Sequence, residues 1–320
     1  MNDSRTMLRQ YNLPTPRTDL CLLLLVCILI PCLPVGAVEP DRSNSHIELG
    51  IINERAANGD TREQVILGTM YYFGDVVPQD YAQAVSWWKK AAEQGDAEAQ
   101  YDLGRAYFVG NGETKDATVA AAWCRKAADQ SFAPAQDKLG SAYHFGDGVV
   151  KDDVQAVNWY RKAAEQGYAR AEYDLGTMYY FGDGVKKDAV EAIRWFRKAA
   201  EQGDARAQNN LGDAYHRGFG VRKDDGEAVI WFYKAAEQGN PQGQHNLGAM
   251  YHAGVGIPKD DVQAFLWYSL AAAQHDSKAA AALASFEQSM TADQIADARR
   301  RAAEWRPIPK AESGVPLVTD

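Results

Sequence analysis

Apolar residues recur along this chain with the spacing of α-helices. In the segment 169–181 they stand at positions i, i+4, i+7 and i+8, as Ala171, Leu175, Met178 and Tyr179. This spacing places them on one face of a helix. The segment 189–201 repeats the pattern around Trp195. Each such unit is therefore predicted to contain two amphipathic helices.

Helix-breaking and helix-capping residues separate the two predicted helices. Gly182 and Gly184 end the first helix, and Asp188 stands where an N-cap side chain accepts bonds from the free amides of the second. Gly203 tolerates the positive φ found just beyond a helix, and Asp204 is placed to cap the next helix. The pattern predicts a helix-turn-helix unit with no strand.

The same unit recurs at a fixed interval of 36 residues, as from Leu67 to Leu103. A tyrosine, a glycine, an aspartate, an alanine and a tryptophan recur in register with it. The interval is marked by a Leu-Gly pair that begins at Leu67, Leu103, Leu139, Leu175, Leu211 and Leu247. An internal repeat of this length predicts a solenoid, in which each unit buries its apolar face against its neighbours.

The recurring motif, L-G-x-M/A-Y-x-x-G-x-G-V-x-K-D-x-x-x-A-x-x-W-x-x-K-A-A-E-Q-G-D, closely resembles the Sel1-like repeat family, a relative of the tetratricopeptide repeat. The resemblance covers six full units over residues 61–276. It implies an all-α, right-handed α-solenoid of stacked helix-turn-helix repeats. It also implies an interaction scaffold, because Sel1-like proteins generally serve in signalling, quality control and host contact.

Weaker copies of the motif extend to both ends of the array. Residues 38–60 are predicted to form an N-terminal capping helix, and residues 277–306 to form C-terminal capping helices. In the latter, Thr291 and Gln294 have the spacing of a capping box. Residues 307–320 are rich in proline and are predicted to form a disordered tail.

The N-terminal segment 1–37 has the pattern of an export signal. Basic residues precede the apolar run 20–30, and small residues ending at Ala37 offer a cleavage site. The alternative is an uncleaved anchor, but Pro31 and Pro34 leave about a dozen apolar residues, fewer than the roughly 20 that a spanning helix needs. We therefore expect cleavage near Ala37, a periplasmic or secreted protein, and no membrane insertion afterwards.

The net charge and the cysteine content limit the partners and the stabilising bonds that the protein can have. The net charge is −9 without a basic stripe, which argues against nucleic acid as a partner. After cleavage only Cys124 remains of the four cysteines, so no internal disulfide is expected. Stability must then come from helix packing.

The positions that vary between repeats indicate a binding surface. Tyr173 and Tyr180 lie about 140–160° around the first helix from Leu175, at 100° per residue, so they are expected to face away from the core. This face lines a concave groove by analogy with tetratricopeptide arrays. The alternative is packing between neighbouring turns of the superhelix. The candidate groove residues are Tyr72, Tyr101, Arg105, Phe108, His144, Tyr173, Tyr180, His216, His245 and His252.

The sequence offers no evident catalytic or metal site. None of the repeated columns pairs a nucleophile with a base, and the repeated aspartates are better explained as helix caps. His245 and His252 are seven residues apart, or about 10 Å along a helix, too far to share one zinc ion readily. We therefore predict no cofactor and no metal.

Three functions are compatible with these observations. The first is an exported, non-catalytic scaffold or regulator that binds a protein or an extended peptide in the groove. The second is an envelope enzyme of the β-lactamase or penicillin-binding type, to which cysteine-rich relatives have been linked, although this chain lacks their cysteines. The third is a module that binds a cell-wall polymer, with groove tyrosines stacking on sugars.

Overall fold

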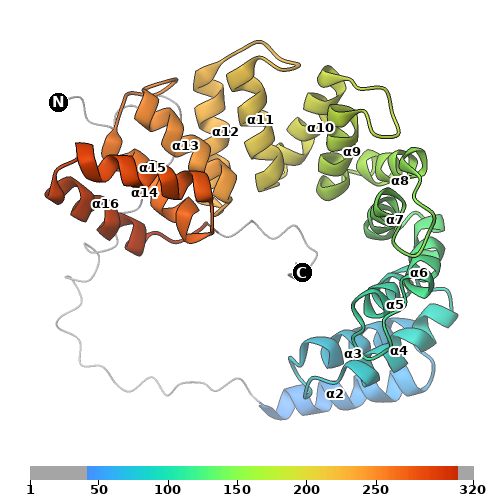
Figure 1. Ribbon diagram of the computed structural model, residues 1–320. Helices are drawn as coiled ribbons and strands as arrows, with labels where there is room; N and C mark the ends of the chain where they lie inside the picture. Colours follow the sequence, from blue (N-terminus) through green and yellow to red (C-terminus); the bar gives the residue numbers. More distant parts are fainter. Residues whose placement is uncertain (1–41, 309–320) are drawn as a thin grey trace, which may run out of the picture. The chain divides into compact units, whose positions relative to one another are not determined.

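The computed structural model describes residues 42–308, and within that range it contains helices and no strand (Figure 1). The predicted all-α fold is confirmed. The predicted signal segment 1–37 and residues 309–320 of the predicted tail lie outside the described residues. None of the described helices is long and apolar enough to cross a membrane.

The helices are α2 Arg42–Ala57, α3 Thr61–Phe73, α4 Tyr81–Glu93, α5 Ala97–Val109, α6 Ala117–Asp129, α7 Ala133–Phe145, α8 Asp153–Glu165, α9 Ala169–Phe181, α10 Ala189–Glu201, α11 Ala205–Arg217, α12 Asp225–Glu237, α13 Pro241–Ala253, α14 Asp261–Ala273, α15 Ser277–Ser289 and α16 Ala292–Glu304.

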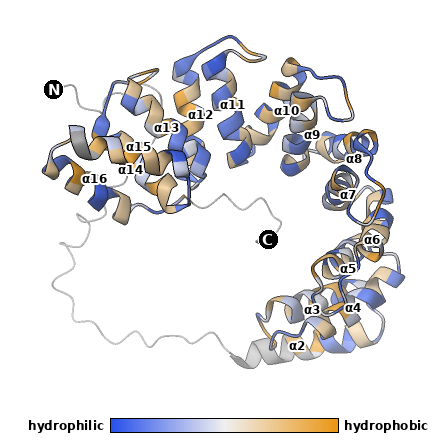
Figure 2. Cartoon of the chain, viewed as in Figure 1, coloured by the Kyte–Doolittle hydropathy of each residue, from blue (hydrophilic) through white to orange (hydrophobic). Residues whose placement is uncertain are grey.

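Each repeat contributes a first helix and a second helix, which we call its A helix and its B helix. The A helices are α3, α5, α7, α9, α11 and α13, and the B helices are α4, α6, α8, α10, α12 and α14. Figure 2 shows apolar and polar residues mixed along the helices of both kinds. Gly182 ends α9 with a φ of 87°, and Asp188 caps α10 by accepting bonds from the amides of Val190 and Glu191. The predicted end signals are therefore confirmed in this repeat.

The chain divides into two compact units at Lys90. The first unit holds α2, α3 and most of α4. Its Leu67 is fully buried, and the Trp88 ring packs over Gly68. The second unit begins at Ala91, and its consecutive helices from α5 to α15 pack on one another, while α16 packs on α14. Six repeats thus use one packing scheme, and five of them lie wholly within the second unit.

The core of each repeat in the second unit depends on a close approach between an A-helix glycine and a B-helix side chain. A Cβ atom on Gly176 would lie 2.7 Å from Cδ1 of Phe196, well inside the 3.5–4.0 Å at which carbon atoms attract each other. Gly140 meets Tyr160 and Gly212 meets Phe232 in the same way. Only glycine lets the ring lie this close to the helix backbone, so the helix spacing depends on this pair.

Hydrogen bonds at the repeat junctions follow a second recurring pattern. Gln136 of α7 donates to the carbonyl of Ala128 in the preceding repeat at 3.1 Å and accepts from Gln166 at 2.7 Å. The side chain satisfies a buried carbonyl that lies at a helix end. Glu172 replaces this glutamine in the next repeat and accepts from Gln202 at 2.7 Å. Burial raises the pKa of Glu172, because its charged form has lost water.

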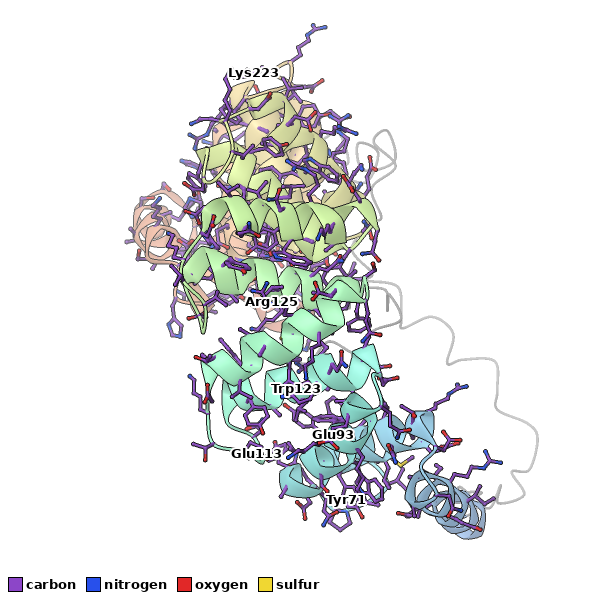
Figure 3. All side chains as sticks on the ribbon, turned by 90° about the vertical axis from the view of Figure 1, so that its right-hand side faces the viewer. Tyr71, Glu93, Glu113, Trp123, Arg125 and Lys223 are labelled. Carbon is purple, nitrogen blue, oxygen red and sulfur yellow. The ribbon has the colours of Figure 1, made fainter. Side chains whose placement is uncertain are left out.

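The B helices carry cations that pack along aromatic rings. In α6, whose Trp123 and Arg125 are labelled in Figure 3, the Lys126 ammonium lies 3.8 Å from the centroid of the Trp123 ring. Arg125 donates to the hydroxyl of Tyr143 in the next repeat. Arg197 makes the equivalent bond to Tyr215 at 2.9 Å. The repeated cations therefore cover tryptophans and connect neighbouring repeats.

The junction after the second repeat departs from the glycine-aspartate pattern. Ser131 has a φ of 64°, the left-handed conformation that Gly167 adopts with a φ of 80° at the equivalent position. Phe132 stands at the N-cap of α7 and makes no side-chain capping bond. Its ring instead packs against Tyr101 at a centroid distance of 5.6 Å. An aromatic contact between repeats thus takes the place of a helix cap.

Helices α15 and α16 cover the C-terminal end of the stack. Thr291 and Gln294 form the predicted capping box at the start of α16. Beyond it, the Trp305 ring lies 6.2 Å from that of Trp267, and the amide of Ile308 donates to the Glu237 carbonyl at 2.7 Å. We predicted a disordered tail from residue 307. The structure differs at its start, because this hydrogen bond holds residue 308 against α12.

The tryptophan of the B helix provides a test of the packing. Trp195 is 6% exposed, so Trp195→Ala should lower the free energy of unfolding by about 3–5 kcal/mol through lost contacts and a cavity. Chemical denaturation of the purified protein measures this change. The control is Val190→Ala on the same helix, where the side chain is 65% exposed and little change is expected. An unchanged midpoint for Trp195→Ala would show that this tryptophan is not part of the core.

Candidate functional site

The candidate site is the surface formed by the A helices of the second unit, on the side opposite their buried leucines. We call it the A-helix face, and it comprises the side chains of α5, α7, α9, α11 and α13 that are not in the leucine core. Nine of the ten predicted groove residues are half-buried, and His252 is exposed. Tyr72 lies in the first unit, where its ring packs against Tyr81 and Trp88 at 5.1 and 5.2 Å.

The tyrosines of α9 are half-buried among side chains of their own repeat and of the next. Tyr173 lies 5.7 Å from the Phe196 ring, and the Arg206 guanidinium of the next repeat lies 4.2 Å from the Tyr173 centroid. Tyr180 lies 4.9 Å from Phe219, which also belongs to the next repeat. These contacts fix both rings before any partner binds.

The structure differs here from the expectation that these side chains face directly away from packed regions. The A helices of successive repeats lie close enough for side-chain contact, as between Asn246 and Asn209, whose Nδ2 and Oδ1 atoms are 2.9 Å apart. Each A helix therefore covers part of its neighbour. The effect is greatest at Asp137, which sequence spacing places on this face and which is only 3% exposed.

The aromatic side chains of α5 are also held by neighbours. Arg105 forms an ion pair with Asp102 at 3.3 Å and lies 5.7 Å from the Tyr101 ring. The Lys138 ammonium of the next repeat lies 3.9 Å from the Phe108 centroid. Burial raises the pKa of Asp102 to about 7, against the opposing effect of Arg105. This end of the face therefore combines apolar rings with a carboxyl group whose pKa is close to neutral pH.

Three of the predicted histidines belong to a recurring hydrogen-bond motif. His144, His216 and His252 each lie 2.6–2.8 Å, through Nδ1, from the aspartate that begins the following B helix. In the fifth repeat that aspartate is Asp225, and its other oxygen lies 3.4 Å from the Lys223 ammonium, labelled in Figure 3. The histidines thus join the A helix to the B helix. Within the described residues no group of three or more metal-binding side chains occurs.

His245 lies apart from that motif, beside a pocket of about 240 Å³ between α11 and α13. Its Nδ1 atom is buried, lies 3.4 Å from Asp276 Oδ1, and makes no hydrogen bond with any described residue. Its ring packs edge-on against Tyr268 at 5.4 Å. Asn209, Asn210 and Asn246 line the same pocket, and sequence reasoning did not single them out.

A buried cluster of charges connects α7, α9 and α11. Asp137 is buried beside Asp174, and its Oδ2 atom lies 3.4 Å from Nε of Arg170. Burial, and then the Asp174 carboxylate, raise the pKa of Asp137, while Arg170 opposes the change. Arg206 pairs with Asp204 at 2.9 Å, and its positive charge opposes the rise in the pKa of Asp174. Burial raises the pKa of Asp174 as well, so both carboxyl groups hold a proton more tightly than free carboxyl groups do.

Sequence reasoning missed this cluster, although one signal for it was present. At the helix position of Tyr101, Tyr173 and Asn209, the third repeat carries an aspartate. An acid among uncharged neighbours at an equivalent position indicates a local partner. Identifying that partner required the placement of Arg170 and Asp174 in the next repeat.

Cys124 occupies the position that an aromatic ring fills in the other repeats. Its Sγ atom lies over Gly104, and it lines a small pocket of about 20 Å³, roughly the space of one water molecule. Burial raises the pKa of the thiol to about 12. The thiol is therefore protonated and covered, as expected for a core residue.

The buried carboxyl pair predicts a pH-dependent stability. Because the pKa of Asp137 is raised in the folded protein, the folded state binds more protons, and the free energy of unfolding should fall as pH rises above about 4. Asp137→Asn should remove this loss and stabilise the protein by about 1–3 kcal/mol near pH 8. Thermal unfolding at about pH 5 and about pH 8 measures the difference. Asp129→Asn at an exposed position is the control, and equal pH slopes for wild type and Asp137→Asn would contradict the prediction.

Comparison with known proteins identifies the repeat. The model of the Sel1 repeat matches six consecutive segments, residues 64–96, 97–132, 133–168, 169–204, 205–240 and 241–276. The crystal structure of c5321, a protective antigen of uropathogenic Escherichia coli strains with an SLR fold, is 37% identical with a TM-score of 0.70. That match covers 80% of this chain, which spans only 56% of c5321.

A Sel1 repeat protein from Oxalobacter formigenes is 35% identical over 72% of this chain and 96% of its own, with a TM-score of 0.63. A comparison with curated proteins gives no match. The six matched segments together cover more than half of the chain and coincide with the helix pairs of the structure. The chain therefore belongs to the Sel1 repeat family.

Proposed function

We propose that this protein binds another protein, or an extended peptide, along its A-helix face and catalyses no reaction. Sel1 repeat proteins generally mediate protein–protein interaction, and typically act as scaffolds without enzymatic activity. That family property supports the class of function. The choice of surface rests on the side chains of this chain.

The observation that carries the proposal is the contrast between a constant core and a variable A-helix face. Equivalent core positions hold Leu175, Leu211 and Leu247, all fully buried. Equivalent positions on the A-helix face hold Tyr173, Asn209 and His245. Packing of the repeats requires the same residue at each leucine position. It does not require the same residue at the variable positions of the A-helix face, which can therefore be adapted to a partner.

The aromatic residues of this face suit a binding role because they are already ordered. Tyr173 is held by Phe196 and Arg206, and Tyr180 is held by Phe219. A ring that is ordered before binding loses little conformational entropy when a partner arrives. Tyrosine is also among the residue types that dominate interface energies.

The alternative functions have less support from the described residues. The envelope-enzyme hypothesis derives from cysteine-rich relatives, and the one cysteine in the described range, Cys124, is buried with a raised pKa. The polymer-binding hypothesis requires rings that are free to stack on sugars. Tyr173 instead has one neighbour in Phe196 and another in Arg206.

We also propose that the protein acts outside the cytoplasm, after removal of residues 1–37. The proposal rests on the basic, apolar and small-residue segments that precede Val38. N-terminal sequencing of the protein recovered from the cell envelope or the medium should begin near Val38. Recovery of a chain that still begins at Met1 would support a retained anchor instead.

The binding proposal predicts that the face and the core can be separated by mutation. Once a partner is captured from the envelope fraction and identified, Tyr173→Ala and Tyr180→Ala should each weaken its binding by about 2 kcal/mol or more if these rings are hot spots. Isothermal titration calorimetry measures the dissociation constant, and the melting temperature is recorded in parallel.

The matched controls lie on the B helices, where Asn158 and Val190 are exposed. Asn158→Ala and Val190→Ala should leave the dissociation constant unchanged. The proposal fails if the tyrosine variants bind as tightly as wild type. It also fails if their affinity falls only together with a collapse of the melting temperature, because the tyrosines would then be purely structural.

A further inference from the structure

A pocket on the A-helix face lies across the fifth and sixth repeats. It has a volume of about 240 Å³ and is lined by α11, α13 and the start of α15. Three asparagines, Asn209, Asn210 and Asn246, and the side chain of Gln242 supply much of its wall. Amide side chains are thus concentrated at one place on this face.

The amide groups form a partly completed hydrogen-bond chain. Asn246 Nδ2 donates to Asn209 Oδ1 at 2.9 Å, and Asn209 Nδ2 lies 3.5 Å from Asn210 Oδ1. Asn246 Oδ1 and Asn210 Nδ2 make no hydrogen bond with another described residue, so one acceptor and one donor remain on residues that line the pocket. The two ends of the chain therefore offer complementary bonds to a ligand.

The charged groups of the pocket are largely compensated. Asp213 pairs with Arg217 at 2.7 Å, and Asp276 accepts from the amide of Ala279 at 2.8 Å as the N-cap of α15. Asp276 also lies beside His245. Lys278 also lines the pocket, so the two carboxylates, Asp213 and Asp276, are matched in number by two cations, Arg217 and Lys278. The pocket therefore favours an uncharged polar ligand.

The kinds of side chain that line the pocket distinguish between classes of uncharged ligand. Within the described residues, the walls contain amide, carboxylate, cationic and imidazole groups but no phenyl, phenol or indole ring. Sugars in proteins are commonly held by stacking on aromatic rings, as the polymer-binding hypothesis assumed. A peptide group needs only one donor and one acceptor in a plane, which asparagine and glutamine side chains match.

We propose that this pocket binds the main chain of an extended peptide segment through Asn209, Asn210 and Asn246. The side-chain amides of Asn209 and Asn246 are 2.9 Å apart, and an extended chain advances about 3.3 Å per residue. The asparagines of α11 and α13 would therefore contact the same peptide group or neighbouring ones. Side chains of the bound segment would point alternately toward the face and away from it.

This inference rests on the proposed function and adds the chemistry of recognition to it. Contacts to the main chain give affinity that does not depend on ligand sequence. The half-buried rings of α9 then supply the sequence preference, since Tyr173 and Tyr180 offer apolar surface one repeat away. Substitutions of the pocket asparagines should therefore change affinity for any peptide, whereas substitutions of the α9 tyrosines should change the preference for ligand sequence.

The test uses tetraglycine with an acetyl group and an amide at its ends, which offers a main chain and no side chain. It is titrated into the full-length protein labelled with ¹⁵N, and the backbone amide signals are followed by nuclear magnetic resonance. We expect shifts confined to α11, α13 and the start of α15. Asn246→Leu should weaken this binding at least about tenfold, or about 1.4 kcal/mol, with an unchanged melting temperature.

Asn158→Leu on the exposed side of α8 is the matched control and should bind the probe as wild type does. Because Asn246→Leu also removes the bond to Asn209, Asn210→Ala provides a second variant that leaves that bond in place. The inference is overturned if tetraglycine causes no shifts or shifts elsewhere. It is also overturned if both variants bind normally, or if N-acetylglucosamine produces the same shifts at lower concentration.

Failure here is distinguishable from failure of the proposed function. If the captured partner binds wild type and Asn246→Leu equally, while Tyr173→Ala abolishes its binding, the A-helix face is the binding surface and the pocket inference is wrong. If the partner loses affinity for Asn246→Leu and tetraglycine competes with it, both are supported.

Discussion

The contact between an A-helix glycine and the B-helix side chain opposite it governs the rest of this structure. Gly176 and Phe196 meet at a distance that excludes even a methyl group. This approach sets the spacing of the two helices and buries the leucine on one side and the tryptophan on the other. Where the ring is lost, at Cys124, the backbone arrangement persists beside a small pocket. The scaffold thus tolerates one weakened layer because each repeat packs mainly on its neighbours.

Regular packing of this kind leads to the polar features of the A-helix face. Because the A helices lie side by side, side chains 37 residues apart, one position more than the repeat interval, meet across repeats. Two asparagines at such a junction form a hydrogen bond, as Asn246 and Asn209 do. Two acids at such a junction must share a proton or recruit arginine, as Asp137 and Asp174 do with Arg170. Identical geometry therefore produces a different chemistry at each junction.

Much of the fold was predictable because helices, caps and the repeat interval are local properties. Asp188, Gly182 and the capping box at Thr291 act as their spacing indicates. The candidate site was predictable only in part. Tyr173 and Tyr180 lie on the expected helix face, but their half-burial comes from Arg206 and Phe219 in the next repeat. Helical periodicity describes one helix and contains no information about which neighbour covers it.

The sequence by itself determined the all-α repeat, the number of its copies and the residues of the core, because a leucine, a glycine and a tryptophan at fixed spacing have one efficient way to pack. The tertiary structure alone decided which variable positions are open to solvent. It placed Asp137 in the interior although helical spacing puts it on the outer face, and it brought Asn209 and Asn246 to one pocket. The reason is that the rotation between successive repeats sets which A-helix side chains meet, and that rotation results from packing over whole repeats.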